Sequence, residues 1–238
     1  MSGRRLQRGI IRILEQLLAP GVCLGCGCDP GDHHSMCASC SQLIIRVPNP
    51  CQYCGQPNPL QGLICPACRL NPPHWQKIIA PLQYRGLTRD YLLQLKYSEA
   101  LYLAKSLCQQ ALDPFRLNWP RPEVLLPVPL HRKRLLERGY NQAREIAQVL
   151  STELDIPIDQ RALTRQRDTP VQSGLSAQQR VDNVHQAFSW SPRRDYRHVA
   201  IVDDIVTTGS TVTEITGLLH REGVEFVEIW ALARAYRR

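Results

Sequence analysis

The sequence lacks a long uninterrupted apolar segment. Charged residues such as Arg12 and Glu15 interrupt the N-terminal stretch, which therefore has no apolar centre of the kind that a signal peptide requires. No later stretch has the length and apolar character of a transmembrane helix. These absences predict a cytoplasmic protein without a transmembrane segment. Residues 1–20 carry apolar residues at helical spacing, so we expect an amphipathic helix that docks on protein or lies at the inner face of the membrane.

Acidic residues are also few. The chain of 238 residues has 21 Asp and Glu against 29 Lys and Arg, which gives a formal net charge of +8. Basic residues gather in segments such as His131–Arg134. This excess suits a polyanionic partner, so phosphates, free or within nucleic acid, are the expected ligands. The hydrophobic content of 43% is that of a globular protein with one sizeable core and a small accessory module.

Eight of the ten cysteines form a duplicated pattern of Cys-x2-Cys pairs. Each cysteine of the second set follows one of the first by 28 positions: Cys23, Cys26, Cys37 and Cys40, then Cys51, Cys54, Cys65 and Cys68. In a reducing cytosol such pairs hold metal more often than they form disulfides. Four thiolates suit tetrahedral zinc, and so short a module has too little core to fold without it. We predict a double zinc-ribbon module over residues 21–75 with about two structural zinc ions.

The spacing leaves the pairing of these ligands open. One ion per repeat is the simplest arrangement, although the first pair of each repeat could also share an ion. Gly27 and Gly55 lie in the same register after those pairs, as expected where glycine lets backbone N–H groups approach the sulfurs. Other candidate ligands are expected in the exposed first loop or in the core: Cys28, His33 and His34, and Cys108.

Residues 76–238 are expected to form a separate α/β domain. Pro72 and Pro73 stiffen the exit from the cysteine module and favour a boundary near residue 76. Short apolar strands then alternate with helical segments, which indicates a parallel sheet covered on both faces. The expected strands are 78–84, 124–129, 199–202 and 224–232. A basic loop follows the second strand, and the expected helical segments are 87–112, 141–154 and 210–222.

A polar segment follows the strand expected over residues 199–202. It contains two acids and then a hydroxyl-rich start of a helix: Asp203, Asp204, Thr207, Thr208, Gly209, Ser210 and Thr211. Parallel sheets bind ligands beyond the carboxyl ends of their strands. Carboxylates can accept hydrogen bonds from ribose hydroxyls, and a helix N-terminus attracts phosphate. An Asp-Asp turn followed by Ser/Thr helix capping is the simpler alternative, but the ordered pattern favours a ribose 5-phosphate site.

This segment resembles the phosphoribosyl pyrophosphate signature of type I phosphoribosyltransferases. The chain as a whole resembles the competence protein F family, which joins cysteine ribbons to that fold. Three further segments carry the resemblance: Leu95-Lys96-Tyr97; Pro129-Leu130-His131 with Arg138-Gly139-Tyr140-Asn141-Gln142; and Arg165, Arg167, Thr169, Gln172 and Leu175 with Arg180 and Asn183. The resemblance implies a protein that binds phosphoribosyl pyrophosphate with magnesium and is associated with DNA uptake or utilisation.

The residue chemistry and the resemblance together suggest roles for these side chains. Asp203 and Asp204 would stabilise a positive ribose during transfer. Arg138 with Gly139 suits a pyrophosphate loop, since arginine pairs with phosphate oxygens in a bidentate fork. Arg165 and Arg167 would belong to a flap that closes over the pyrophosphate. Solvated basic loops are the alternative for these arginines, and Lys96 is expected to be solvated.

Two classes of function remain open. The first is a phosphoribosyltransferase with an unidentified acceptor; Ser2 follows Met1 and no glutaminase domain is evident, so a complete glutamine-dependent amidophosphoribosyltransferase is not expected. The second is a protein of the DNA-uptake machinery that binds single-stranded DNA and senses the ligand without turnover. Base stacking and phosphate contacts would then come from Tyr53 and Trp75 and from Arg46, Arg69 and Lys77, although such aromatics more often pack on a neighbouring domain.

Overall fold

The computed structural model describes residues 22–30, 35–60, 63–98, 100–167 and 187–236. The chain divides into two compact units, Met1–Ile44 and Ile45–Arg238. The first unit holds the first four cysteines and the short helix α2 (Ala38–Gln42). The amphipathic helix expected over residues 1–20 lies outside the described residues, and the predicted domain limits stay predictions. Among the described residues, no helix has the length and apolar character needed to cross a membrane.

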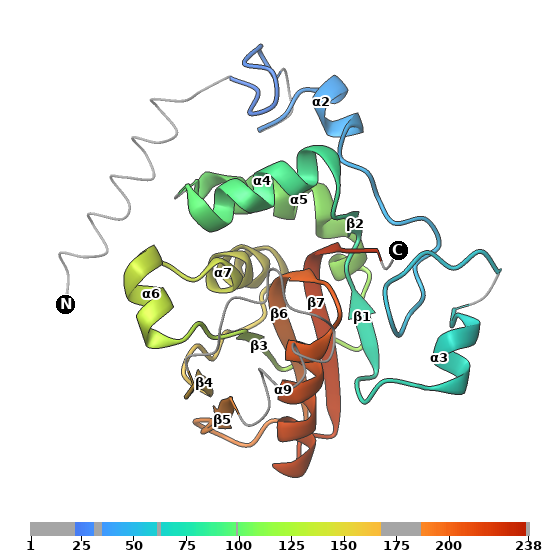
Figure 1. The fold of residues 1–238 in the computed structure, drawn as a ribbon, viewed down its shortest axis with the longest axis vertical. Helices are drawn as coiled ribbons and strands as arrows, with labels where there is room; N and C mark the ends of the chain where they lie inside the picture. The colour runs from blue at the N-terminus through green and yellow to red at the C-terminus, as the bar shows by residue number, and fades with distance from the viewer. Residues whose placement is uncertain (1–21, 31–34, 61–62, 99, 168–186, 237–238) are drawn as a thin grey trace. The chain divides into compact units, whose positions relative to one another are not determined.

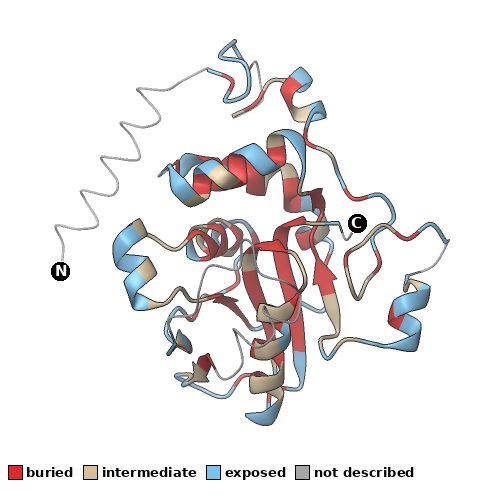
Figure 2. Cartoon of the chain, in the orientation of Figure 1, coloured by how far each residue is buried: buried red, intermediate tan, exposed pale blue. Residues whose placement is uncertain are grey.

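A five-stranded sheet forms the centre of the second unit, and its strands pair in parallel (Figure 1). The strand order is β1-β7-β6-β3, and β2 also pairs with β7. The strands are β1 (Lys77–Ile79), β2 (Leu82–Gln83), β3 (Val124–Pro127), β6 (His198–Val206) and β7 (Phe226–Arg234). Their apolar runs are buried almost throughout, as both faces of a parallel sheet require (Figure 2). The predicted α/β class with a parallel sheet is confirmed.

Helices cover both faces of this sheet. α5 (Tyr102–Arg116) and α7 (Gln142–Leu154) pack on one face, and α9 (Ser210–Arg221) packs on the other (Figure 1). α4 (Gly86–Tyr97) packs on α5, so the helical pattern expected over residues 87–112 forms two helices. Asn141 begins α7, because its side-chain oxygen accepts a hydrogen bond from the backbone N–H of Ala143. The second unit also contains α3 (Pro66–Leu70), beside the second set of cysteines.

Two segments differ from the sequence-based expectation. The basic stretch after β3 is a short helix, α6 (Arg132–Arg138), rather than a loop. His131 accepts a hydrogen bond from the N–H of Lys133 at its start, and Gly139 ends it with a φ of 79°. β6 continues to Val206 instead of ending at Val202, because it stays paired with β7 as far as Arg234. Asp203 and Asp204 therefore lie in the last part of the strand.

A small antiparallel pair of strands lies beside the sheet. It consists of β4 (Leu163–Arg165) and β5 (Phe188–Trp190). Arg165 lies in β4, so the chain around it is a strand where the sequence indicates an irregular stretch. Most of the third segment that carries the family resemblance, from Thr169 to Asn183, lies outside the described residues.

Candidate functional site

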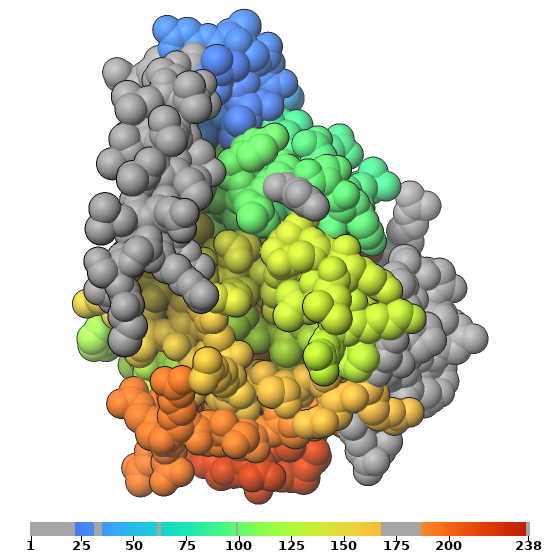
Figure 3. Space-filling view, turned by 90° about the vertical axis from the view of Figure 1, so that its left-hand side faces the viewer, coloured from blue at the N-terminus to red at the C-terminus, as the bar shows by residue number. Residues whose placement is uncertain are grey.

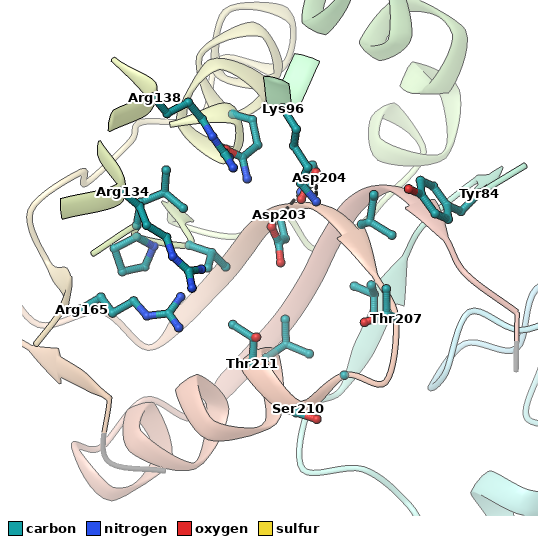
Figure 4. Close-up of a pocket in the computed structure, with 18 of the residues that line it drawn as sticks. Tyr84, Lys96, Arg134, Arg138, Arg165, Asp203, Asp204, Thr207, Ser210 and Thr211 are labelled. Carbon is teal, nitrogen blue, oxygen red and sulfur yellow. Dashed lines mark hydrogen bonds and ion pairs between the residues drawn. The ribbon is translucent and has the colours of Figure 1, made fainter. Parts of the chain in front are cut away.

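A pocket of about 300 Å³ lies at the carboxyl end of the sheet in the second unit. Its base is the end of β6, and its walls come from α4, α6, β4 and the turn before α9 (Figure 4). The polar lining residues carry charges, hydroxyls or an amide: Tyr84, Lys96, Tyr97, Arg134, Arg138, Gln142, Arg165, Asp203, Asp204, Thr207, Ser210 and Thr211. This is the edge at which parallel α/β sheets bind their ligands.

The two acids at the base of the pocket have different partners. Nζ of Lys96 lies 2.7 Å from Oδ2 of Asp204, and the side chains are 24% and 4% exposed. The backbone N–H of Asp204 donates to Oδ1 of Asp203 over 2.9 Å. Burial alone would lower the pKa of Lys96, but the neighbouring charge and hydrogen bond of Asp204 raise it above its ordinary value. Lys96 therefore stays positive and pairs with the carboxyl group of Asp204.

Asp203 is an acid that holds its proton unusually well. Burial raises its pKa well above the ordinary value, and the adjacent charge of Asp204 raises it further, while Lys96 acts in the opposite direction. Acids with a perturbed pKa cluster at functional sites. A group that donates hydrogen bonds or carries positive charge would draw Asp203 into its ionised form.

The turn between β6 and α9 forms the hydroxyl-rich side of the pocket. Gly209 is the N-cap of α9 and has a φ of 88°, a left-handed conformation that favours glycine. Because glycine has no side chain, α9 does not begin with the Ser/Thr N-cap that the simpler alternative proposed. The hydroxyls of Thr208 and Ser210 lie 2.8 Å apart, and Ser210 and Thr211 line the pocket. The start of α9 can therefore receive an anion.

Three arginines line the opposite side of the pocket (Figure 4). Arg134 and Arg138 come from α6, and Arg165 comes from β4. Nη1 of Arg138 donates to Oε1 of Gln142 over 2.6 Å, and its guanidinium carbon lies 5.5 Å from the ring centre of Tyr97. The guanidinium carbon of Arg165 lies 5.5 Å from the ring centre of Phe188. Planar cations held in this way suit the oxygens of phosphate groups.

The structure brings most of the sequence-predicted residues into one pocket. Those that line it are Asp203, Asp204, Thr207, Gly209, Ser210, Thr211, Arg138 and Arg165. Three others do not line it. Thr208 contacts the hydroxyl of Ser210, Gly139 ends α6, and Arg167 is exposed.

Lys96, Arg134 and Gln142 join the site without having been placed there from the sequence. The expectation that Lys96 is solvated is wrong, because it forms an ion pair with the buried Asp204. The sequence feature that could have pointed to Lys96 is the Leu95-Lys96-Tyr97 segment, but it lies far from Asp204 along the chain. Arg134 belongs to the basic cluster that suggested a polyanionic ligand, and Gln142 follows Asn141 in the segment that resembles the family.

The cysteines form two groups of four, one in each repeat. They are Cys23, Cys26, Cys37 and Cys40, and Cys51, Cys54, Cys65 and Cys68; within each group the sulfurs lie within 4.8 Å of one another. The sulfurs of Cys26 and Cys37 lie 3.8 Å apart, as do those of Cys54 and Cys65. A tetrahedral ion with sulfur bonds of about 2.3 Å would set its ligands roughly 3.8 Å apart. The grouping by repeat resolves the pairing that the spacing left open.

Backbone amides prepare both groups for a metal. The N–H of Cys37 donates to the sulfur of Cys23 over 3.2 Å, and the N–H of Cys65 donates to that of Cys51 over 3.3 Å. Although burial opposes ionisation, these amides and their neighbours lower the pKa of Cys23 to about 6 and that of Cys51 to about 7. Such amides stabilise thiolate ligands.

The remaining cysteines and histidines of interest lie elsewhere. Cys28 is exposed and outside the first group, and Cys108 is buried in α5, as predicted. His33 and His34 lie outside the described residues.

Several of the residues proposed for DNA contact are engaged within the second unit. Nε1 of Trp75 donates to the carbonyl oxygen of Tyr53 over 2.6 Å. Nη2 of Arg46 donates to the carbonyl oxygen of Gln110 over 2.7 Å, and Nζ of Lys77 donates to Oδ1 of Asn118 over 2.5 Å. Arg69 is exposed in α3. Packing within the protein thus accounts for Trp75, as the alternative anticipated.

Several known proteins are similar to this chain. The phosphoribosyl transferase domain family matches residues 135–238. "DNA utilization protein YhgH" of Escherichia coli strain K12 is 35% identical over 92% of this chain and 99% of its own length. "Competence protein F" of Haemophilus influenzae is 35% identical over 85% of this chain and 91% of its own. A match to the crystal structure of a purine phosphoribosyltransferase from Pyrococcus horikoshii covers 60% of this chain and 83% of the chain in that structure. The sequence identity is 16% and the TM-score is 0.28.

Proposed function

Because this chain belongs to the competence protein F family, we propose that its pocket binds phosphoribosyl pyrophosphate together with magnesium. One observation carries the proposal. The acid pair Asp203 and Asp204 lies between a helix N-terminus and three arginines within a single pocket. A ribose with a phosphate at one end and a pyrophosphate at the other has this sequence of charges: anion, hydroxyls, anion.

The 5-phosphate and the ribose would occupy the β6–α9 side of the pocket. Thr207, Ser210 and Thr211 line that side, and the first N–H groups of α9 add the positive end of the helix dipole. The ribose hydroxyls would donate to Asp203 and Asp204, which line the base. Hydrogen-bond donors should stabilise the ionised form of Asp203 most, because burial and the charge of Asp204 disfavour that form in the free protein.

The pyrophosphate would lie against Arg134, Arg138 and Arg165. Magnesium prefers oxygen ligands and is usually bound by one or two carboxylates together with the phosphates of a substrate. Asp203 is the carboxylate that fits this role, because Asp204 is already paired with Lys96. Bound magnesium would neutralise charge on the pyrophosphate and make it a better leaving group.

The reaction that this arrangement supports is phosphoribosyl transfer. The bond from the ribose anomeric carbon to the pyrophosphate oxygen would break, and a nucleophile that is still to be identified would form the new bond to that carbon. Asp203 and Asp204 would stabilise the positive charge on the ribose, and the arginines would hold the departing anion.

Calorimetry with phosphoribosyl pyrophosphate and magnesium tests the binding step. Replacing Asp203 and Asp204 by Asn should weaken binding by about 3–6 kcal/mol in total, since a hydrogen bond to a charged group contributes roughly 1.5–3 kcal/mol. Arg138→Ala should weaken the binding of phosphoribosyl pyrophosphate more than the binding of ribose 5-phosphate. Unchanged affinity in a folded double variant would remove the acids from the site. Product analysis with bases, amines and single-stranded DNA as acceptors tests for turnover.

We also propose that the two cysteine groups hold zinc in a structural role. Each group provides four sulfurs and therefore leaves no position open for a catalytic water. The sulfur spacings and the N–H donors suit a tetrahedral thiolate site.

Weak binding of single-stranded DNA is a second candidate function. The observation that favours it is α6, which lies on the face that Figure 3 shows. Its Arg132 and Lys133 are exposed, and the same helix carries two arginines of the pocket. The exposed ring of Tyr97 lies against Arg138 and offers a face for stacking. In this proposal the protein acts in the cytoplasm, at or near the inner face of the membrane, with the DNA-uptake machinery, and the phosphoribosyl pocket senses a ligand.

A further inference from the structure

The second cysteine group contacts the sheet of the second unit closely. Its knuckle, defined here as residues 51–56, lies against β1 and the end of β7. The N–H of Ile78 donates to the carbonyl oxygen of Gln52 over 2.8 Å, and Nε2 of Gln56 donates to that of Ala235 over 2.9 Å. Gly55 lies so close to the sheet that an added Cβ would be 3.3 Å from Cγ2 of Ile78. Close packing against Ile78 thus disfavours a larger residue at Gly55, in addition to its φ of 66°.

Arg234 joins this knuckle to the phosphate turn, defined here as residues 206–211. The residue is 3% exposed. Its Nε donates to the carbonyl oxygen of Cys54 over 2.6 Å, and its Nη1 donates to that of Val206 over 2.6 Å and to that of Thr207. One buried guanidinium therefore fixes the carbonyl of a metal ligand and the backbone at which β6 becomes the turn.

Trp75 forms a second bridge between the same two segments. Its indole Nε1 donates to the carbonyl oxygen of Tyr53, which lies between the ligands Cys51 and Cys54. The far edge of its ring lies against the turn, because a Cβ added at Gly209 would be 3.5 Å from Cη2 of Trp75. Arg234 and Trp75 thus link consecutive carbonyls of the knuckle to two parts of the same turn, Val206–Thr207 and Gly209.

The geometry points to Arg234 and Trp75 as positioning residues that couple the metal in the second cysteine group to the shape of the phosphate turn. A bound ion would fix the knuckle backbone, since a short loop with little core depends on the metal for its structure. Both bridges use that backbone as their anchor. Loss of the ion would free the carbonyls of Tyr53 and Cys54, and the turn would lose restraints at Val206, Thr207 and Gly209.

The coupling can be measured on the turn itself. Amide hydrogen exchange of residues 206–211 reports its order without any ligand. In the full chain, Cys54→Ser, Arg234→Lys and Trp75→Phe should each speed that exchange roughly 10-fold. Arg234→Lys keeps the charge but cannot reach all the carbonyls, and Trp75→Phe keeps an aromatic ring but removes the donor. Cys26→Ser, the equivalent change in the first group, should leave exchange in the turn unchanged.

Exposed residues provide matched controls. Arg197→Lys and Trp119→Phe make the same chemical changes at side chains that are 80% exposed, and they should leave the turn unchanged. If Cys54→Ser does not fold, the Arg234 and Trp75 variants decide the question. Wild-type exchange rates in the folded bridge variants, or equal acceleration in Cys26→Ser and Cys54→Ser, would overturn the coupling.

A second measurement rests on the proposed function. If the pocket binds phosphoribosyl pyrophosphate with magnesium, the variants that loosen the turn should weaken binding roughly 5-fold, a usual size for coupling between sites. Faster exchange together with wild-type affinity would contradict the claim that the turn positions the ligand. If the wild-type protein does not bind phosphoribosyl pyrophosphate, the proposed function fails, and the exchange data still decide whether the knuckle orders the turn.

Discussion

Asp203 and Asp204 are adjacent in the chain but experience different electrostatic surroundings. Asp204 is 4% exposed and lies 2.7 Å from the ammonium of Lys96. Asp203 is half-buried beside that charged carboxylate, and both burial and the charge raise its pKa. Among the described residues, a cation pairs with Asp204 but not with Asp203. This is the arrangement expected of a site prepared for a ligand.

Asp203→Asn should stabilise the free protein. Since folded Asp203 keeps its proton at pH values where the unfolded chain has lost it, the free energy of unfolding decreases as pH rises from about 4 toward the raised pKa. The amide avoids that loss, so we expect a gain on the order of 1 kcal/mol at neutral pH, or roughly 2–4 °C in Tm. Thermal unfolding at several pH values measures it, with the exposed Asp90→Asn as control. Equal pH dependence in wild type and variant would contradict the assignment.

The same substitution should remove a proton release that accompanies binding. Ribose hydroxyls and magnesium both favour the ionised carboxylate, so a ligand expels the proton of Asp203 and binds more tightly as pH rises. Calorimetry in two buffers with different ionisation enthalpies counts the protons. Because the ligand phosphates also titrate, the informative quantity is the difference between wild type and Asp203→Asn. No difference would exclude Asp203 from contact with the ligand.

Lys96→Met should be costly because it leaves Asp204 buried without its counter-charge. Breaking a fully buried pair costs about 3–5 kcal/mol, and we expect roughly 2 kcal/mol here because Lys96 is 24% exposed. Urea unfolding measures the loss. Adding Asp204→Asn should recover most of it, since the two residues act as a pair. Lys105→Met, an exposed lysine on α5, is the control, and an equal cost at both lysines would show that the ion pair contributes nothing.

At the scale of elements, the sequence was informative wherever a segment buries an apolar face. The strands that became β3, β6 and β7 and the helices α7 and α9 were predicted because continuous or periodic apolar residues mark them. α6 was missed because its leucines, Leu135 and Leu136, are exposed, so its sequence has no core-facing stripe. The end of β6 was placed too early, because two aspartates interrupt the apolar run while the backbone pairing continues.

Gly209→Ala should distinguish the effect of the left-handed backbone on stability from the effect of the contact with Trp75 on ligand binding. Gly209 and Gly223 have nearly equal φ values of 88° and 89°, but only at Gly209 would a Cβ meet Trp75. Alanine at either position should cost roughly 1–2 kcal/mol through its left-handed backbone conformation. Only Gly209→Ala should also weaken ligand binding. Urea unfolding and calorimetry measure the two effects, and equal affinities in the two variants would argue against a role of the turn in the site.

At the scale of the whole molecule, the limits of sequence reasoning lie in contacts between distant segments. The acid pair, the turn and Arg138 could be recognised because each sits in an ordered local pattern. Lys96 could not be assigned to the pocket, because its pairing with Asp204 depends on how α4 packs over the end of β6. Likewise, spacing alone did not reveal which cysteines form each group of four, or that Arg234 donates to the carbonyl oxygen of one of them.

Two zinc ions per chain are expected in the purified protein. Each group of four cysteines is complete within one repeat, so Cys26→Ser and Cys54→Ser should each lose one ion and retain the other. Elemental analysis with titration of free thiols measures both quantities. Iron in place of zinc would contradict the prediction, and so would one zinc per chain with the second set titrating as free thiols.

Binding of single-stranded DNA should be weak, independent of sequence and strongly dependent on salt. The net charge of +8 supplies the attraction, and counterion release makes such binding fall steeply as salt rises. We expect α6 to contribute more than the ribbon, because Arg46, Trp75 and Lys77 already bond within the protein. Fluorescence anisotropy with labelled strands at low and physiological salt measures the affinity of the intact protein.

Paired substitutions then distinguish the two surfaces. Changing Arg132 and Lys133 of α6 to Gln should weaken binding and reduce the salt slope by about 0.7 for each DNA phosphate that the variant no longer neutralises. Arg69→Gln on α3 tests the ribbon, and Arg197→Gln, 80% exposed, is the control for removal of charge alone. Equal effects of the three changes per positive charge removed would indicate nonspecific attraction without a defined surface. A larger effect at Arg69 would assign the DNA-binding surface to the ribbon, and no binding at low salt would leave the phosphoribosyl pocket as the sole proposed site of function.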